Sequence, residues 1–286
     1  MDFLAVSVFA FVGGVAQFVD GTLGMGFGVI SATLLTVLGY SAVAASAGTH
    51  AAKVATCFAS GVSHWREGNV DWRVLIAVGL PGAFGAFIGA VVLTNIALDN
   101  ARIWMAAILF ILGISIIARF GFGKSLIPAV RLRTRNLWPI GLFGGFVDAT
   151  GGGGWGPVAT PSLMTVTRHE PHRIVGTVSA AEFLVAVSAS LGFLVGATDS
   201  GVPWFAVLGL IIGGVIVAPF AARFTRRAPT APLGVAVGGM VLIANTAVIT
   251  SVLGVSGVIG ASIATVELLI TVAIVIRVVR RKPEPT

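Results

Sequence analysis

The chain has 286 residues, of which 56% are hydrophobic and 10% are charged, and its formal net charge at pH 7 is +7. Soluble domains carry about 25% charged residues, so this composition excludes a soluble globular domain. Cys57 is the single cysteine, which excludes an intrachain disulfide and argues against a cysteine-ligated metal cluster.

Apolar runs recur along the whole chain, and many approach the ~20 residues that cross a bilayer as a helix. In chain order, the predicted helices are about 3–19, 26–39, 42–64, 73–94, 101–119, 137–148, 157–167, 171–196, 203–222, 232–252 and 256–277. The first run has no Lys or Arg before it, so we interpret it as a membrane helix and not as a signal peptide. We therefore predict an all-α, multi-pass protein of the cell membrane that contacts lipid.

A short stretch occurs twice, as VDGTLGMGFG at residues 19–28 and as VDATGGGGWG at residues 147–156. The match extends to Val-x-Trp at 70–72 and 202–204, while the offset drifts from 128 to 132 residues. This pattern predicts an internal duplication. Residues 1–120 form the first repeat, 121–136 a basic linker, 137–253 the second repeat, and 254–286 a last helix with a basic tail.

The number of segments in each repeat predicts how the repeats are oriented. Five is an odd number, so the second repeat starts on the opposite side of the membrane and is inverted. Basic residues mark the cytoplasmic side, and 12 of the 18 flank apolar helices, at Arg119, Lys124, Arg131, Arg133, Arg135, Arg223, Arg226, Arg227, Arg277, Arg280, Arg281 and Lys282. This distribution favours cytoplasmic linkers over nucleic-acid binding. It places the N-terminus and the loop 197–203 outside, and the loop 65–73 and the C-terminus inside.

Glycines in the repeated stretch weaken a helix by about 1 kcal/mol each relative to alanine. Gly24 and Gly26 in the first copy, and Gly152, Gly153 and Gly154 in the second, therefore predict unwound backbone. Its free amides and the restarting helices can bind an anion, with the adjacent Trp155 as a further candidate; close helix packing is the alternative. The helices beside each break are short, so each pair either spans the membrane or re-enters it.

An aspartate precedes each glycine run, at Asp20 and Asp148. An ionised carboxylate inside a membrane costs at least ~2.5 kcal/mol unless it is paired, neutralised or hydrated. Each aspartate either caps the next helix by accepting its amides or takes up a proton during transport. Capping is the favoured interpretation, because a bare negative charge weakens an anion site.

A polar helix start follows each glycine run, as SAGTHAAK at 46–53 and GTVSAAE at 176–182. The aligned hydroxyls of Thr49 and Ser179 either donate to an oxyanion or bond their own backbone. Lys53 is the candidate fixed positive charge; a mutual ion pair with Glu182 and snorkelling to an interface are the alternatives. His50 is either a titrating group or a satisfied polar contact.

The duplicated aspartate-glycine stretch, followed by GTHAAK and TVSAAE, resembles the TauE/SafE family, the sulfite exporter or TSUP group of membrane permeases. The resemblance extends over nearly the whole chain. It implies secondary transport of small anions, often sulfur-containing ones such as sulfite, thiosulfate, sulfonates or sulfoacetate. Some members of the family are linked to other organic anions.

We therefore predict a secondary transporter of small anions that works by alternating access with proton coupling. An organic carboxylate permease and an anion channel are the alternatives. No nucleophile-base pair, metal-ligand cluster or soluble catalytic domain is visible in the sequence, which argues against an enzyme or a lipid-handling protein. The sequence predicts no cofactor and no metal site, and it leaves homo-oligomer formation open.

Overall fold

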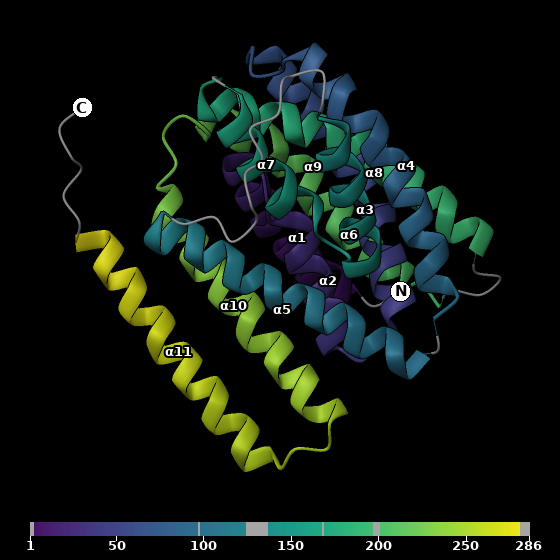
Figure 1. Ribbon diagram of the computed structural model, residues 1–286, viewed down its shortest axis with the longest axis vertical. Coiled ribbons are helices and arrows are strands. Elements are labelled where there is room, and N and C mark those ends of the chain that lie inside the picture. The colour runs from purple at the N-terminus through teal and green to yellow at the C-terminus, as the bar shows by residue number, and fades with distance from the viewer. Residues whose placement is uncertain (1–2, 97, 124–136, 168, 197–200, 281–286) are drawn as a thin grey trace.

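The computed structural model describes residues 3–96, 98–123, 137–167, 169–196 and 201–280. These residues form helices and no strand, which confirms the all-α prediction (Figure 1). In chain order, the helices are α1 (Phe3–Leu23), α2 (Phe27–Val37), α3 (Ala42–Arg66), α4 (Trp72–Thr94), α5 (Leu98–Phe122), α6 (Trp138–Gly151), α7 (Trp155–Val166), α8 (Pro171–Gly196), α9 (Trp204–Phe224), α10 (Thr230–Val252) and α11 (Gly257–Arg280).

Ten of the eleven described helices fall into two groups by length and composition, whereas α3, with 25 residues, is long but less apolar. Among the described residues, seven helices are long and apolar enough to cross a membrane: α1, α4, α5, α8, α9, α10 and α11. The helices α2, α6 and α7 have 11, 14 and 12 residues. At ~1.5 Å per residue, none of these three alone spans the ~30 Å hydrocarbon core. With 21 residues, α1 is longer than the sequence predicts.

Close glycine contacts join α1 to α9 and α6 to α4. A Cβ added at Gly13 would lie 2.7 Å from the Cα of Leu210, and one at Gly141 would lie 3.1 Å from the carbonyl carbon of Val78. Small residues let helix backbones approach this closely, which is how helices associate in membranes. The packing is reciprocal between the two halves of the chain, because α3 also packs on α8 and α5 on α10.

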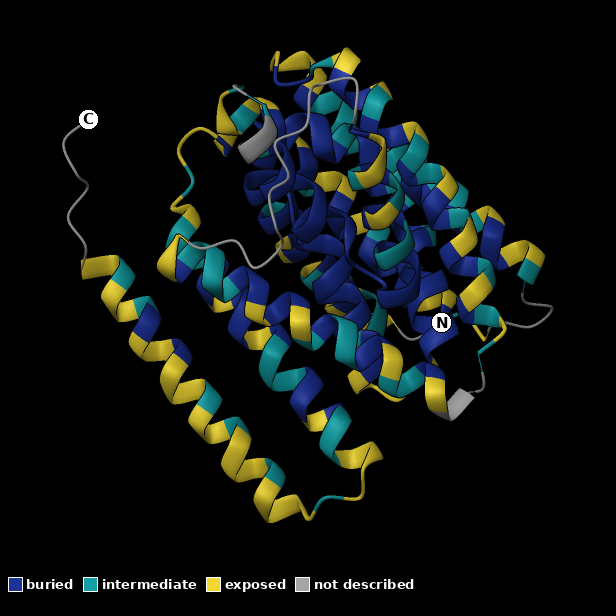
Figure 2. Cartoon of the chain, in the orientation of Figure 1, coloured by how far each residue is buried: buried dark blue, intermediate teal, exposed yellow. Residues whose placement is uncertain are grey.

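The helix α11 lies at the edge of the molecule, where it packs against α10 and is mostly exposed (Figures 1 and 2). Most of the predicted linker, the loop residues 197–200 with Asp199, and the tail residues 281–286 lie outside the described residues. The inverted orientation and the domain boundaries therefore stay predictions. The helices α1 to α10 all contribute to the buried interior, which surrounds the two glycine breaks (Figure 2).

Candidate functional site

Two short breaks interrupt the helices where the glycine motifs occur. The helix α1 ends at Leu23 and α2 begins at Phe27, while α6 ends at Gly151 and α7 begins at Trp155. The first glycine of each break has a positive φ, 69° at Gly24 and 76° at Gly152, a conformation that L side chains rarely adopt. The backbone therefore leaves the helix at equivalent positions in the two motifs.

Each aspartate reaches across its break to the first amide of the next helix. The Oδ1 atom of Asp20 accepts a hydrogen bond from the Phe27 amide at 3.4 Å, and Oδ1 of Asp148 accepts one from the Trp155 amide at 3.1 Å. The first amides of a helix lack an intrahelical partner and carry partial positive charge, which a carboxylate satisfies. Both aspartates thus occupy the same structural position.

The two breaks pack directly against each other. A Cβ at Gly28 would lie 2.6 Å from the Cα of Gly153, and a Cβ at Gly156 would lie 2.6 Å from the Cα of Met25. Only glycine allows two backbones to come this close. Close packing, the alternative interpretation of the motif, therefore accounts for Gly28, Gly153 and Gly156 in this structure.

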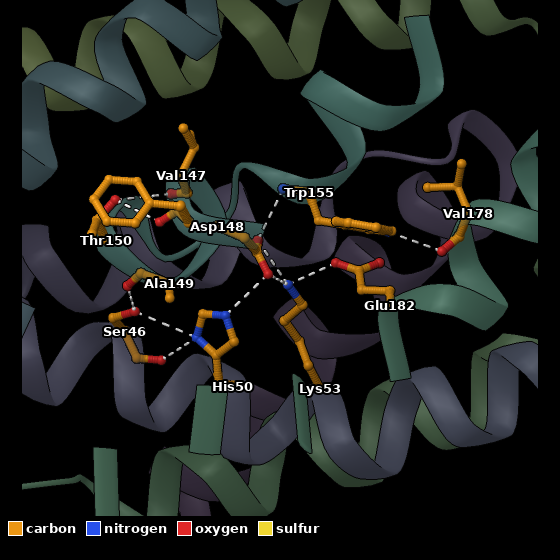
Figure 3. Close-up of polar contacts among 11 residues, drawn as sticks. Ser46, His50, Lys53, Val147, Asp148, Ala149, Thr150, Trp155, Val178 and Glu182 are labelled. Carbon is orange, nitrogen blue, oxygen red and sulfur yellow. Dashed lines mark hydrogen bonds and ion pairs between the residues drawn. The ribbon is translucent and has the colours of Figure 1, made fainter. Parts of the chain in front are cut away.

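Lys53 meets two carboxylates from the other half of the chain (Figure 3). Its Nζ atom lies 2.9 Å from Oδ1 and 2.7 Å from Oδ2 of Asp148, and 2.7 Å from Oε1 of Glu182. Lys53 and Asp148 are fully buried, and the Glu182 side chain is 4% exposed. The lysine is therefore held in an ion-pair network, and it does not snorkel to an interface.

His50 extends this network along α3. Its Nε2 atom lies 3.0 Å from Oδ2 of Asp148, and its Nδ1 atom lies 2.8 Å from the carbonyl oxygen of Ser46 (Figure 3). The Ser46 hydroxyl donates to the carbonyl oxygen of Ala149 at 2.6 Å, which ties α3 to the end of α6. Ser46 is not among the predicted site residues, although its position one turn before His50 places both on the same face of the helix.

The charges of this cluster do not balance without a proton. Lys53 supplies one positive charge, whereas Asp148 and Glu182 supply two negative charges when both are ionised. The carboxylate of Asp20 also lies within electrostatic range of Lys53. Because uncompensated charge is expensive in a membrane interior, this cluster favours binding one proton on a carboxylate.

The hydroxyls of Thr49 and Ser179 have no hydrogen-bond partner among the described residues, although both residues are buried. Hydroxyls in membrane helices commonly donate to their own backbone, as Thr22 does to Phe18 and Thr150 does to Phe146. A buried polar atom without a partner is unusual and calls for a water, ion or ligand. These two hydroxyls are therefore available donors.

The Trp155 side chain packs between helices, whereas the sequence suggests it as a candidate anion-binding residue. Its indole Nε1 donates to the carbonyl oxygen of Val178 at 3.0 Å, and its ring packs against Gly82 of α4 and Gly144 of α6. The side chain is fully buried. Its backbone amide contacts Asp148, whereas its ring joins three helices.

Polar side chains continue along α3 beyond Lys53. A stripe of buried residues comprises Ser46, Thr49, His50, Lys53, Thr56, Cys57, Ser60 and His64. Helical geometry places them within about a third of the helix circumference. Thr56 and Ser60 have unpartnered hydroxyls among the described residues. Among all the residues that the structure describes, no group of three His, Cys, Asp or Glu side chains is arranged to hold a metal.

Seven apolar helices, among the described residues, define a multi-pass membrane protein, and its interior holds two helix breaks and a buried charged cluster. A family model described as "Sulfite exporter TauE/SafE" matches residues 9–248, and the chain belongs to this family. It is therefore a membrane transporter, as the resemblance in the sequence predicts.

Two relatives come from Bacillus subtilis (strain 168). The probable membrane transporter protein YtnM is 42% identical over 243 residues, which is 83% of this chain and 80% of the relative. The probable membrane transporter protein YdhB is 28% identical over 214 residues, which is 73% of this chain and 86% of the relative. No solved structure matches the chain.

Proposed function

We propose that the protein is a proton-coupled secondary transporter of small anions, in which Lys53 binds the anion and Glu182 and Asp148 respond to the proton. The buried Lys53–Asp148–Glu182 cluster is the observation that carries this proposal. It joins α3 to α6 and α8, so a change in its pairing acts on both halves of the chain. Such a contact suits alternating access, in which two halves move around a central site.

Lys53 gives the site a full positive charge in a place where water is excluded. An anion that leaves water needs strong compensation, and hydrogen bonds from amides and hydroxyls supply only partial charges. Thr49 lies one turn before Lys53, and its unpartnered hydroxyl adds a donor. Ser179 supplies a second unpartnered hydroxyl from α8, three residues before Glu182.

The carboxylates make anion binding depend on protons. An incoming anion competes with Asp148 and Glu182 for the Lys53 ammonium. Protonation of Glu182 removes its negative charge and releases the ammonium to the anion. When one negative charge of the anion enters with one proton, the total charge of the cluster does not change. Movement of the anion and the proton in the same direction therefore avoids the penalty for burying net charge.

The polar stripe of α3 offers the proton a route. It leads from Lys53 past Thr56 and Ser60 to His64 at the end of the helix, where Nδ1 lies 3.4 Å from Nδ2 of Asn69. Buried hydroxyls without partners are positions where ordered water is expected. In α8, the buried residues that follow Glu182 are apolar, so the route leads from the cluster toward the loop after α3.

The family description names sulfite, which favours sulfur oxyanions as the cargo. A carboxylate presents similar oxygen acceptors, so an organic carboxylate permease is the second candidate. An anion channel differs in mechanism, because a channel carries anions only down their gradient.

Binding of radiolabelled thiosulfate to the purified protein, at an acidic and an alkaline pH, tests this assignment. Lys53→Met should weaken binding by about 10-fold to 100-fold, because a charge-assisted contact contributes about 1.5–3 kcal/mol. Arg66→Met, which removes a positive charge from the exposed end of the same helix, is the matched control and should bind normally. Unchanged affinity in a folded Lys53→Met protein would reduce this lysine to a structural role.

The Glu182→Gln variant tests the proton response in the same assay. Wild-type affinity should rise as the pH falls, because protonation of Glu182 releases Lys53. In Glu182→Gln the affinity should stay near the acidic wild-type value at both pH values. A full pH response in this variant would show that another group binds the coupled proton.

A further inference from the structure

A cavity of about 240 Å³ lies at the end of the molecule where α1 and α5 finish and where α8 and α10 begin. Its lining includes Leu23, Arg119, Met164, His172, Val175 and Thr230. We refer to it as the α5-end cavity. None of the Lys53 cluster lines it, so it is a separate feature of the fold.

Arg119 supplies a positive charge that no carboxylate balances within the described part of the chain. Its guanidinium contacts the sulfur of Met164 and lies 5.6 Å from the centre of the Phe120 ring. Thioether sulfur is a weak acceptor, and a ring face is a weak partner for a cation. Arg119 therefore retains most of its capacity to bind an oxyanion in a bidentate manner.

The surroundings of Arg119 reinforce the positive potential. His172 stands in the first turn of α8, where the helix dipole contributes partial positive charge, although the amides of Arg173 and Ile174 donate to the carbonyl oxygen of Glu170. The charges of Arg173 and Arg226 also act on His172. Glu170 is the opposing group, with Oε2 lying 3.3 Å from Nδ1 of His172, and its side chain is 74% exposed. Water screens an exposed carboxylate well, so the balance at the cavity is positive.

The floor of the cavity adjoins the first glycine break. Leu23, which lines the cavity, directly precedes Gly24. Val175 lines it too, and a Cβ at Gly24 would lie 3.3 Å from the Cα of Val175. Asp20 caps α2 on the far side of this break. An anion in the cavity would therefore lie close to the glycine break that joins α1 to α2.

We propose that the α5-end cavity is a second oxyanion site, centred on Arg119 and distinct from the Lys53 cluster. The oxyanion is either a small soluble anion, for which the site is an antechamber, or the phosphate of an anionic lipid headgroup. The site itself stands on its own geometry. Its role as an antechamber depends on the transport function proposed above.

The test uses a reporter cysteine, Thr230→Cys, in the full chain with Cys57→Ser, because Thr230 lines the cavity and is exposed. The protein is placed in phosphatidylcholine nanodiscs and reacted with anionic and cationic methanethiosulfonate reagents. The measured quantity is the ratio of the reaction rate of the anionic reagent to that of the cationic one. This ratio should favour the anionic reagent, and Arg119→Leu should reduce it about fivefold. Arg119→Lys should keep the preference. A control cysteine at Ser256, in the loop between α10 and α11, should not respond to either change.

Protection of the reporter identifies the occupant. Slowing by thiosulfate in phosphatidylcholine nanodiscs supports a soluble anion, whereas slowing only after phosphatidylglycerol is included supports a lipid headgroup. Either effect should disappear in Arg119→Leu. The proposal fails if neither compound slows the reaction, or if the slowing persists without Arg119. Protection that remains in Lys53→Met would separate this site from the transport site, whatever the fate of the proposed function.

Discussion

Asp148 and Asp20 occupy equivalent positions but make different numbers of interactions. Asp20 accepts the Phe27 amide, and its other oxygen has no hydrogen-bond partner among the described residues. Asp148 accepts the Trp155 amide and also pairs with Lys53 and His50. The same motif therefore provides a helix cap in one half and the centre of an ion-pair network in the other.

This difference predicts unequal effects of the same substitution. Asp148→Ala leaves Lys53 with Glu182 alone and should destabilise the protein by about 3–5 kcal/mol, as expected when one partner of a buried ion pair is removed. Asp20→Ala removes mainly a cap and should cost about 0.5–2 kcal/mol. Thermal unfolding of both variants in detergent measures the contrast. Equal losses would mean that Asp148 contributes no more than its cap.

The sequence predicted part of this site. Lys53 and Glu182 fall at nearly equivalent places in the repeat, each a turn or two into a predicted helix, and a mutual ion pair is one interpretation of them. The sequence does not predict the participation of Asp148, because this depends on the end of α6 lying beside α3. Sequence periodicity fixes which residues share a helix face, but it does not fix which helices meet.

At the level of elements, the two breaks act as a single packed unit. The backbone at Gly28 approaches that at Gly153, and Gly156 approaches Met25. Moving one break relative to the other therefore requires this backbone contact to separate. The central cluster lies beside this contact, since a Cβ at Gly28 would be 3.5 Å from Nζ of Lys53.

Alanine substitutions test the contact between the breaks. Gly28→Ala places a methyl group against the backbone and should destabilise the protein by about 1–3 kcal/mol, as overpacking does. Gly48→Ala is the matched control, because its Cβ would have no neighbour nearer than 3.5 Å and alanine favours a helix. Size-exclusion profiles after heating report both effects. A stable Gly28→Ala protein would contradict tight packing of the breaks.

The helix boundaries show where local sequence rules stop. The first helix was predicted to end at about residue 19, yet it continues to Leu23. Gly21 stays helical because α9 packs closely on it, and the Thr225 hydroxyl donates to its carbonyl oxygen at 2.7 Å. Tertiary packing thus outweighs the weak helix propensity of glycine. The breaks themselves fall within the glycine runs, as predicted.

For the whole molecule, the charged cluster links the halves that the duplication defines. Lys53 comes from the first half, and Asp148 and Glu182 come from the second. The α5-end cavity lies at one end of this arrangement, beside the first break. If the halves are inverted as predicted, rocking about the cluster would expose Lys53 to each side in turn.

Thiosulfate accumulation in proteoliposomes tests the central claim of proton-coupled transport through Lys53. An acid-outside pH gradient, with the membrane potential clamped, should drive internal thiosulfate above the external concentration. A protonophore should abolish the accumulation, and Lys53→Met should show none, while Arg66→Met behaves as wild type. Flux that stops at equal concentrations whatever the gradient would contradict coupling, and wild-type accumulation in Lys53→Met would contradict the assigned site.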